Sequence, residues 1–133
     1  MSDLTNNIKV TPVIVPQSPS ATGTMSGSVI DTQDAISTTF IISAGAQTTT
    51  GVTVTPVVKS GTATGSTASA EASELIGTEA AAALDGTDGA SSSSKIGYIG
   101  TNRYVTVDLA VANAATGVYS VQCVQEMRKG PQS

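Results

Sequence analysis

Histidine and tryptophan are absent from this 133-residue sequence, which also holds a single cysteine, one phenylalanine and three tyrosines. Without histidine, both the commonest general base and the commonest metal ligand are missing. One cysteine allows neither an intramolecular disulfide framework nor a multi-thiolate metal site. We therefore expect a protein that is not an enzyme and that needs no cofactor or metal.

Positive charge is scarce as well. Six Lys and Arg stand against ten Asp and Glu, which gives a net charge of −4, and the bases form no cluster. A nucleic-acid partner is not expected, because the basic footprint that binds phosphates is missing. Long apolar runs are also missing, and residues 1–10 carry Asp3, so we expect neither a membrane span nor a secretory signal.

Threonine, serine, alanine and glycine dominate what remains, and the larger apolar residues are mostly Val and Ile. Burial of small or hydroxylated side chains yields less free energy than burial of Leu or Phe. The core should therefore be thin, which suggests that the chain works within an assembly that adds stability by binding.

Alternation of apolar and polar residues with a period of two predicts four strands. They cover residues 35–43, 52–58, 103–112 and 118–125. In the first, Ile36, Thr38, Phe40 and Ile42 share the predicted core face. In the last, Cys123 has the apolar parity, which favours a buried, inert thiol. Short loops between the first and second, and between the third and fourth, predict two hairpins.

Several short strands with turn-rich connections indicate an all-β fold, an antiparallel sandwich or barrel. Pro56 should mark an edge or a bulge in its strand. We divide the chain into an extended N-terminal arm over 1–28, a β-domain over 29–126 and a short C-terminal tail over 127–133. Lys9–Val15 could form a short edge strand of the arm; a disordered N-terminus is the alternative.

The β-domain contains a Ser/Ala/Gly-rich insertion over residues 60–94. Its helix formers predict one or two short helical turns, over 68–77 and 78–84, interrupted at Gly77. Low-complexity disorder is the competing interpretation, because few large apolar residues can dock the segment.

Three motifs invite a chemical interpretation and are better explained structurally. The run Asp85–Gly89 has two carboxylates but lacks the further ligands of a calcium loop, so we read it as a turn. Glu71, Glu74 and Glu79 lack an aromatic platform for a sugar and should form a solvated face. Gly97–Gly100 has no basic residue directly on either side and should allow a turn or bulge before the next strand.

The run Lys95–Gly100, followed by Arg103–Val105, resembles a group of small tailed-bacteriophage virion proteins. Two further stretches are similar to the same group: Val29–Thr32, ahead of a strand that ends in Phe40–Ile42, and Leu75–Ala80. These proteins are thought to be head decoration proteins, also called auxiliary capsid proteins. The resemblance spans about residues 28–112.

The resemblance implies a structural protein that decorates and cements a phage capsid by bridging major capsid subunits. It places the protein on the outer surface of the virion, with the major capsid protein as partner and with self-association on the capsid lattice. We expect strand edges near residues 8–15 or 52–58 to pair with a neighbour. The candidate contact residues are Ile8, Val10, Val13, Val15, Val52 and Val54. The alternative is another virion or cell-surface β-sandwich module that binds a host glycan or protein.

Overall fold

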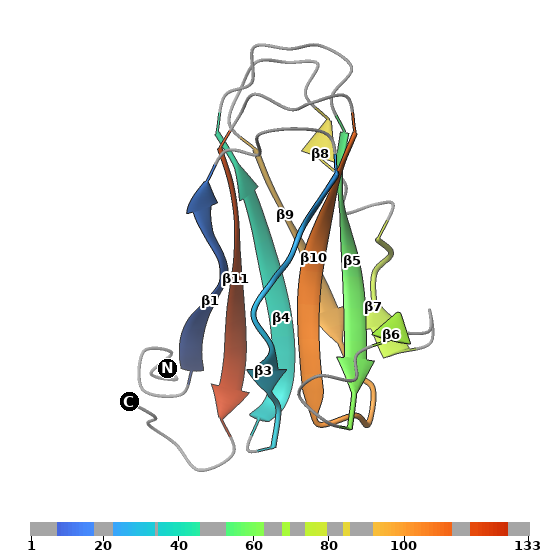
Figure 1. Cartoon of the computed structure of the whole chain (residues 1–133). Coiled ribbons are helices and arrows are strands. Elements are labelled where there is room, and N and C mark those ends of the chain that lie inside the picture. Colours follow the sequence, from blue (N-terminus) through green and yellow to red (C-terminus); the bar gives the residue numbers. More distant parts are fainter. Residues whose placement is uncertain are drawn as a thin grey trace.

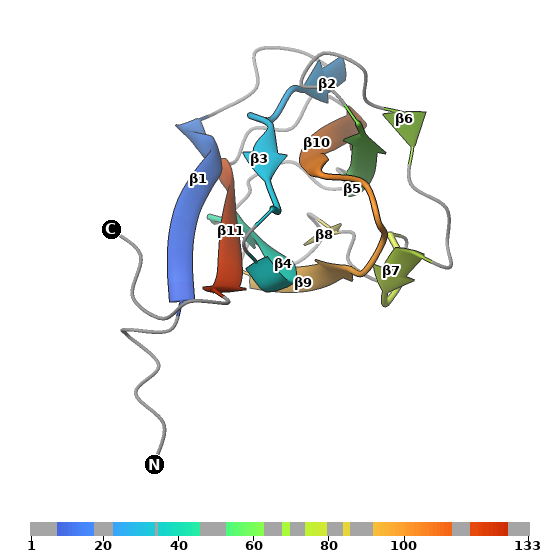
Figure 2. The same cartoon turned by 90° about the horizontal axis from the view of Figure 1, so that it is seen from below.

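The chain folds as two antiparallel β-sheets that pack face to face. The structure, a computed structural model, describes residues 8–17, 23–33, 35–45, 53–62, 68–69, 74–79, 84–85, 92–112 and 118–127. Figure 1 shows the long strands running side by side along the molecule, and Figure 2 shows the two sheets from one end, with the core between them. The expected all-β sandwich is confirmed.

The first sheet has five strands in the order β1-β11-β4-β9-β7. Its members are β1 (Ile8–Gln17), β4 (Ala35–Ala44), β7 (Leu75–Ile76), β9 (Ser92–Tyr98) and β11 (Tyr119–Met127). β1 therefore forms one edge of this sheet among the described residues, and the two-residue β7 forms the other.

The second sheet has six strands, four of them in the order β2-β10-β5-β6. β3 also pairs with β10, and β8 pairs with β5. Its members are β2 (Gly23–Met25), β3 (Ile30–Asp31), β5 (Thr53–Gly61), β6 (Ala68–Ser69), β8 (Leu84–Asp85) and β10 (Tyr104–Ala112). The pair β5 and β10 forms its centre.

The four strands predicted from alternation are all present, at bounds close to those expected, but the two predicted hairpins are wrong. β4 pairs with β11 and β9, whereas β5 pairs with β10 in the other sheet. β10 and β11 likewise belong to different sheets. Strands that follow each other in the sequence thus lie in different sheets here. Alternation could not show this, because it reports which face of a strand is buried and not which strand lies beside it.

The insertion over residues 60–94 differs from the expectation too. Its described residues form the short strands β6, β7 and β8, with a 3₁₀ conformation at Glu74, in place of the predicted helical turns. The serine run at its end belongs to β9, which pairs with β4 from Thr38↔Tyr98 to Ala44↔Ser92. Cross-strand pairing therefore overrides the helix propensity and the low complexity of this region.

The core consists of inward-facing residues from both sheets, mostly Val and Ile. Phe40, Tyr119 and Leu109 are its largest fully buried apolar side chains besides the isoleucines, and Cys123 is fully buried beside them. Phe40 lies opposite Cys123 on β11 and Ile96 on β9 in the strand register. The expected burial of Cys123 is confirmed.

The crossing segment, residues 26–29 between β2 and β3, forms hydrogen bonds to strands of both sheets. Ser28 N donates to Val13 O of β1 at 2.9 Å, and Thr106 Oγ1 of β10 donates to Ser28 O at 2.8 Å. Gly27 N donates to Asp108 Oδ1 at 2.9 Å, and Asp108 also pairs with Lys59 at 2.9 Å. The segment can pass this close to β10 because Gly27 has no side chain: a Cβ there would overlap the carbonyl oxygen of Val107.

β1 is extended, as expected of the arm, and it is also part of the sandwich. It pairs with β11 from Ile8↔Glu126 to Gln17↔Tyr119. Register shifts follow Pro12 and Ile14, and the bulge lets the consecutive residues Val13 and Ile14 both be buried. Residues 8–17 therefore contribute to the core. At the other end of the chain, Met127 belongs to β11 and pairs with Ala35.

The outer edge of β5 is protected along its length. β8 covers Thr53 and Val54, and β6 covers Lys59 and Ser60. Between them, Val58 N donates to Glu79 Oε2 at 2.6 Å. Alternate residues of a strand point their amides to the same edge, so the next donor on this edge would come from Pro56, which has none.

β5 is an interior strand without a bulge at Pro56, which differs from the expectation, although no described strand pairs with Pro56 on the side away from β10. Glu79 is not the solvated residue that we expected. Its side chain is half-buried and satisfies a strand amide. A carboxylate cap and a proline together leave no backbone donor of this stretch open to an incoming strand.

Candidate functional site

The most distinctive surface lies at the end of the sandwich where β4 begins and β9 ends, the lower end in Figure 1. Two segments cross between the sheets here. Residues 32–34 connect β3 to β4, and residues 99–103 connect β9 to β10. Thr32 joins the crossovers: its backbone amide donates to Arg103 O at 2.8 Å, and its hydroxyl donates to the same oxygen at 2.7 Å.

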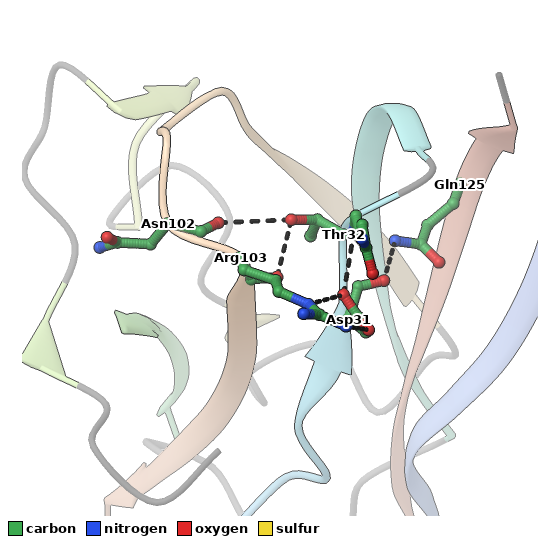
Figure 3. A network of polar contacts seen from close by, with 6 residues as sticks. Asp31, Thr32, Asn102, Arg103 and Gln125 are labelled. Atoms are coloured by element: carbon green, nitrogen blue, oxygen red, sulfur yellow. Dashed lines mark hydrogen bonds and ion pairs between the residues drawn. The ribbon is translucent and has the colours of Figure 1, made fainter. Parts of the chain in front are cut away.

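A polar network holds these crossovers in place (Figure 3). Arg103 donates through Nε and Nη2 to both carboxylate oxygens of Asp31, at 2.9 and 2.8 Å. The Arg103 guanidinium also lies 5.1 Å from the centre of the Tyr104 ring. From β11, the buried Gln125 donates to Asp31 O at 3.2 Å and so ties the first crossover to the first sheet.

Between the crossovers lies a cleft of about 430 Å³. Three large aliphatic side chains at its margin are exposed to solvent: Ile36 of β4, Ile76 of β7 and Ile99, at 58%, 62% and 58%. Exposed apolar residues are ordinary when scattered, but several around one concave surface make this cleft a candidate contact site. Sequence alternation placed Ile36 in the core, which is wrong: the register with β11 shifts at this residue, and the pairing of β4 with β9 has already ended.

The Gly97–Gly100 motif has a structural explanation at this cleft. A Cβ on Gly97 would lie 3.1 Å from Ile76 Cβ, so the glycine lets β7 pack closely on β9. A Cβ on Gly100 would overlap the hydroxyl of Tyr98, which accepts a hydrogen bond from Asn102 N at 3.3 Å. The motif therefore shapes the cleft instead of forming a phosphate-binding loop.

The predicted contact residues do not gather at one place. Val13 and Val54 are buried in the core, and Val54 is covered further by β8, so neither offers its side chain to a partner. Val10 and Val15 of β1 are more than half exposed, and Ile8 is half-buried. Val52 lies outside the described residues, as do most of the Asp85–Gly89 motif and Glu71.

The edge at β1 is only partly suited to strand addition. Pro12 and Pro16 remove two amides, and the register shifts break the ladder after Pro12. The regular stretch is Ile8–Thr11, where Val10 is exposed. Of the two predicted edges, the one at β5 is capped, and the one at β1 is regular only over these four residues.

The Asp31–Arg103 pair should give a small pH dependence. The hydrogen bonds from Arg103 hold the pKa of Asp31 below its ordinary value of 3.8. A lowered carboxyl pKa stabilises the fold above the ordinary value, and this contribution is lost as the pH falls through the folded-state pKa. Both side chains are nearly half exposed, so the pair contributes less than about 1 kcal/mol.

We therefore expect Asp31→Asn to lower the free energy of unfolding slightly at neutral pH and to match the parent protein in strong acid. Urea unfolding of both proteins over a pH series measures this difference. A difference that grows as the pH falls would contradict the assignment.

Cys123 should be unreactive in the folded protein. Burial raises the pKa of its thiol to about 12, and the more distant charge of Lys9 lowers it only in part. Because the thiolate is the reactive form, an aromatic disulfide reagent at pH 8 should modify the native protein no faster than the protein unfolds. In urea the same thiol should react within the mixing time. Rapid modification without denaturant would show that the strand opens locally.

No group of three or more acidic or cysteine side chains among the described residues is placed to hold a metal ion. No helix in the described part is long and apolar enough to cross a membrane.

Comparison with known proteins gives no family. No family model matches the sequence, and no curated protein matches it. One solved structure with a similar arrangement comes from work titled "Bacillus endospore appendages form a novel family of disulfide-linked pili"; it covers 92% of this chain and 89% of that chain at 17% identity, with a TM-score of 0.44. A likeness this distant carries no argument about function.

Proposed function

We propose that this protein is a structural component of a phage virion that decorates the outer surface of the capsid and cements it by binding major capsid subunits. The observation that carries the proposal is the cleft with Ile36, Ile76 and Ile99 exposed at its margin. The sequence stretches that resemble head decoration proteins meet at this cleft: Leu75–Ile76 pairs with β9, and Val29–Thr32 with β10 and Arg103.

The free energy that the cleft can contribute to binding is small, which favours binding to a lattice of capsid subunits over binding to a single free partner. Full burial of an Ile side chain contributes about 1.5–3 kcal/mol, so covering the exposed part of three contributes about 3–5 kcal/mol. Association of two free proteins costs about 4–15 kcal/mol in lost freedom. The cleft alone would therefore bind a free partner weakly, whereas many copies on one shell gain from effective concentration. Binding that favours the assembled shell then stabilises it by linkage.

Replacing isoleucines at the cleft should weaken binding to capsids. For the double variant Ile36→Ser, Ile99→Ser we expect a loss of about 2–3 kcal/mol, or about 30- to 150-fold in affinity for purified heads. Occupancy measured over a concentration series, by gel densitometry or electron microscopy, tests this. Both side chains are already solvent-exposed, so the unfolding midpoint should change little.

Val118→Ser is a matched control, because Val118 is 48% exposed and lies beside Gly45 at the opposite end of β4. It should bind heads like the parent protein. Equal binding by all three proteins would reject the cleft as the docking surface. Deleting residues 1–20 is a poorer test, because it removes the core residues Val13 and Ile14.

The alternative, a module that binds a host glycan, has less support at this site. Tyr98 is the one aromatic residue that lines the cleft, and its ring is buried at 5% exposure, so it offers no open face for a sugar to stack on. A glycan array with a clear hit that is lost in the Ile99→Ser variant would favour the alternative.

A further inference from the structure

The first three residues of β4 extend beyond the end of the antiparallel neighbour β9. On the β11 side, Ala35 and Ser37 pair with Met127 and Glu126. On the other side, pairing with β9 starts only at Thr38, because the chain leaves the sheet after Tyr98 and crosses to β10. Residues 35–37 therefore have no strand beside them on that side among the described residues. The cleft lies at the place where β9 would continue.

We propose that this cleft receives an extended segment of the shell-forming protein, which adds to β4 beside residues 35–37. The segment lies in the line of β9, antiparallel to β4, and places an aliphatic side chain among Ile36, Ile76 and Ile99. This inference rests on the proposed function. It specifies that the part of the shell-forming protein that binds is an extended chain segment and not a flat folded surface.

The dimensions fit a short segment. Three strand residues span about 10 Å. The register with β11 shifts between Ser37↔Glu126 and Ala35↔Met127, so Ile36 has no register partner on that strand. The volume of about 430 Å³ lies in the range of sites that enclose a few residues of a ligand. Backbone pairing supplies affinity in strand addition, and the side-chain pocket supplies selectivity.

The chemistry of the lining favours an aliphatic side chain over a charged one. The Thr32 hydroxyl donates to Arg103 O, and Asn102 N donates to the Tyr98 hydroxyl. Asn102 Nδ2 donates to Ser60 Oγ at 3.0 Å, away from the crossovers. These polar groups bond to each other, and Ile36, Ile76 and Ile99 give the lining an exposed apolar part on which an aliphatic side chain can pack. A second free copy is disfavoured as occupant, because so small an apolar contact does not hold two free proteins together.

Photo-crosslinking on intact particles tests the proposal. A diazirine-bearing aliphatic residue replaces Ile99 in one variant and Val118 in a control, and each variant is bound to purified heads before irradiation. Crosslinks from position 99 are expected to fall within one short stretch of the major capsid protein, which position 118 does not label. Crosslinks between copies of this chain, or scattered over the capsid protein, would overturn the inference while leaving the proposed function intact. Absence of bound protein before irradiation would instead reject the function.

Hydrogen exchange separates strand addition from simple apolar contact. On bound particles, exchange in a peptide that covers residues 35–37 should slow at least tenfold relative to the free protein. A peptide that covers residues 40–44, paired on both sides already, should change little. Unchanged exchange over residues 35–37 in a bound particle would reject the added strand.

Discussion

Phe40→Ala is expected to lower the free energy of unfolding by about 3–5 kcal/mol, the usual cost of removing a buried phenyl ring. Phe40 is the only phenylalanine of the chain and is fully buried on the central strand of the five-stranded sheet. Its neighbours across the sheet, Cys123 and Ile96, are smaller, and both are held by a strand ladder that cannot easily close around the cavity.

Ile41→Ala is the matched control for this prediction. Ile41 is the next residue of β4, points to the outer face and is 38% exposed. Its replacement should cost less than about 1 kcal/mol. Urea unfolding followed by tyrosine fluorescence gives both values, and equal costs for the two variants would mean that β4 does not present Phe40 to the core.

Gly27→Ala should destabilise the protein by about 3 kcal/mol, although it adds a single methyl group. The new Cβ would overlap the Val107 carbonyl oxygen and lie 2.6 Å from Val13 Cγ1. The backbone atom belongs to the central strand β10, so the crossing segment has to move away. That movement weakens the hydrogen bond from Gly27 N to Asp108, whose carboxylate is largely buried.

Gly45→Ala provides the comparison. A Cβ on Gly45 would meet the Val118 carbonyl oxygen at 3.7 Å, an ordinary contact distance. We expect its unfolding midpoint to stay near that of the parent. If Gly27→Ala proved as stable as Gly45→Ala, the close passage between β1 and β10 would be wrong.

Local pattern predicted the strands well because burial on one face imposes a period of two. The alternation around Phe40 and around Val107 marks strands whose inward residues are fully buried. The same pattern could not assign strands to sheets, since a loop as short as residues 113–117 joins either two neighbours in one sheet or two strands facing each other across the core. β9 escaped prediction because its serine run has no alternation and gains its order from pairing with β4.

The candidate site was harder to foresee, because it depends on where a strand loses its neighbour. Ile36 has the parity of a core residue in the sequence, but it lies at a register shift between β4 and β11 and beyond the end of the pairing with β9, and it is exposed. Glu79 looked like a surface residue, yet it caps an amide 21 positions earlier in the sequence, at Val58. The one useful signal was the Gly97–Gly100 block, whose glycines make room for Ile76 and Tyr98.

The pairing of β1 with β11 bears on how the protein is made. Ile8 lies beside Glu126, so β1 gains its partner strand only after the intervening strands β2 to β10 have been synthesised. Loops of this length make contact formation slow, on the order of milliseconds to seconds for β-sandwiches. Until β11 has been synthesised, β1 lacks its partner strand, and newly made chains at high concentration are then most open to mispairing with one another.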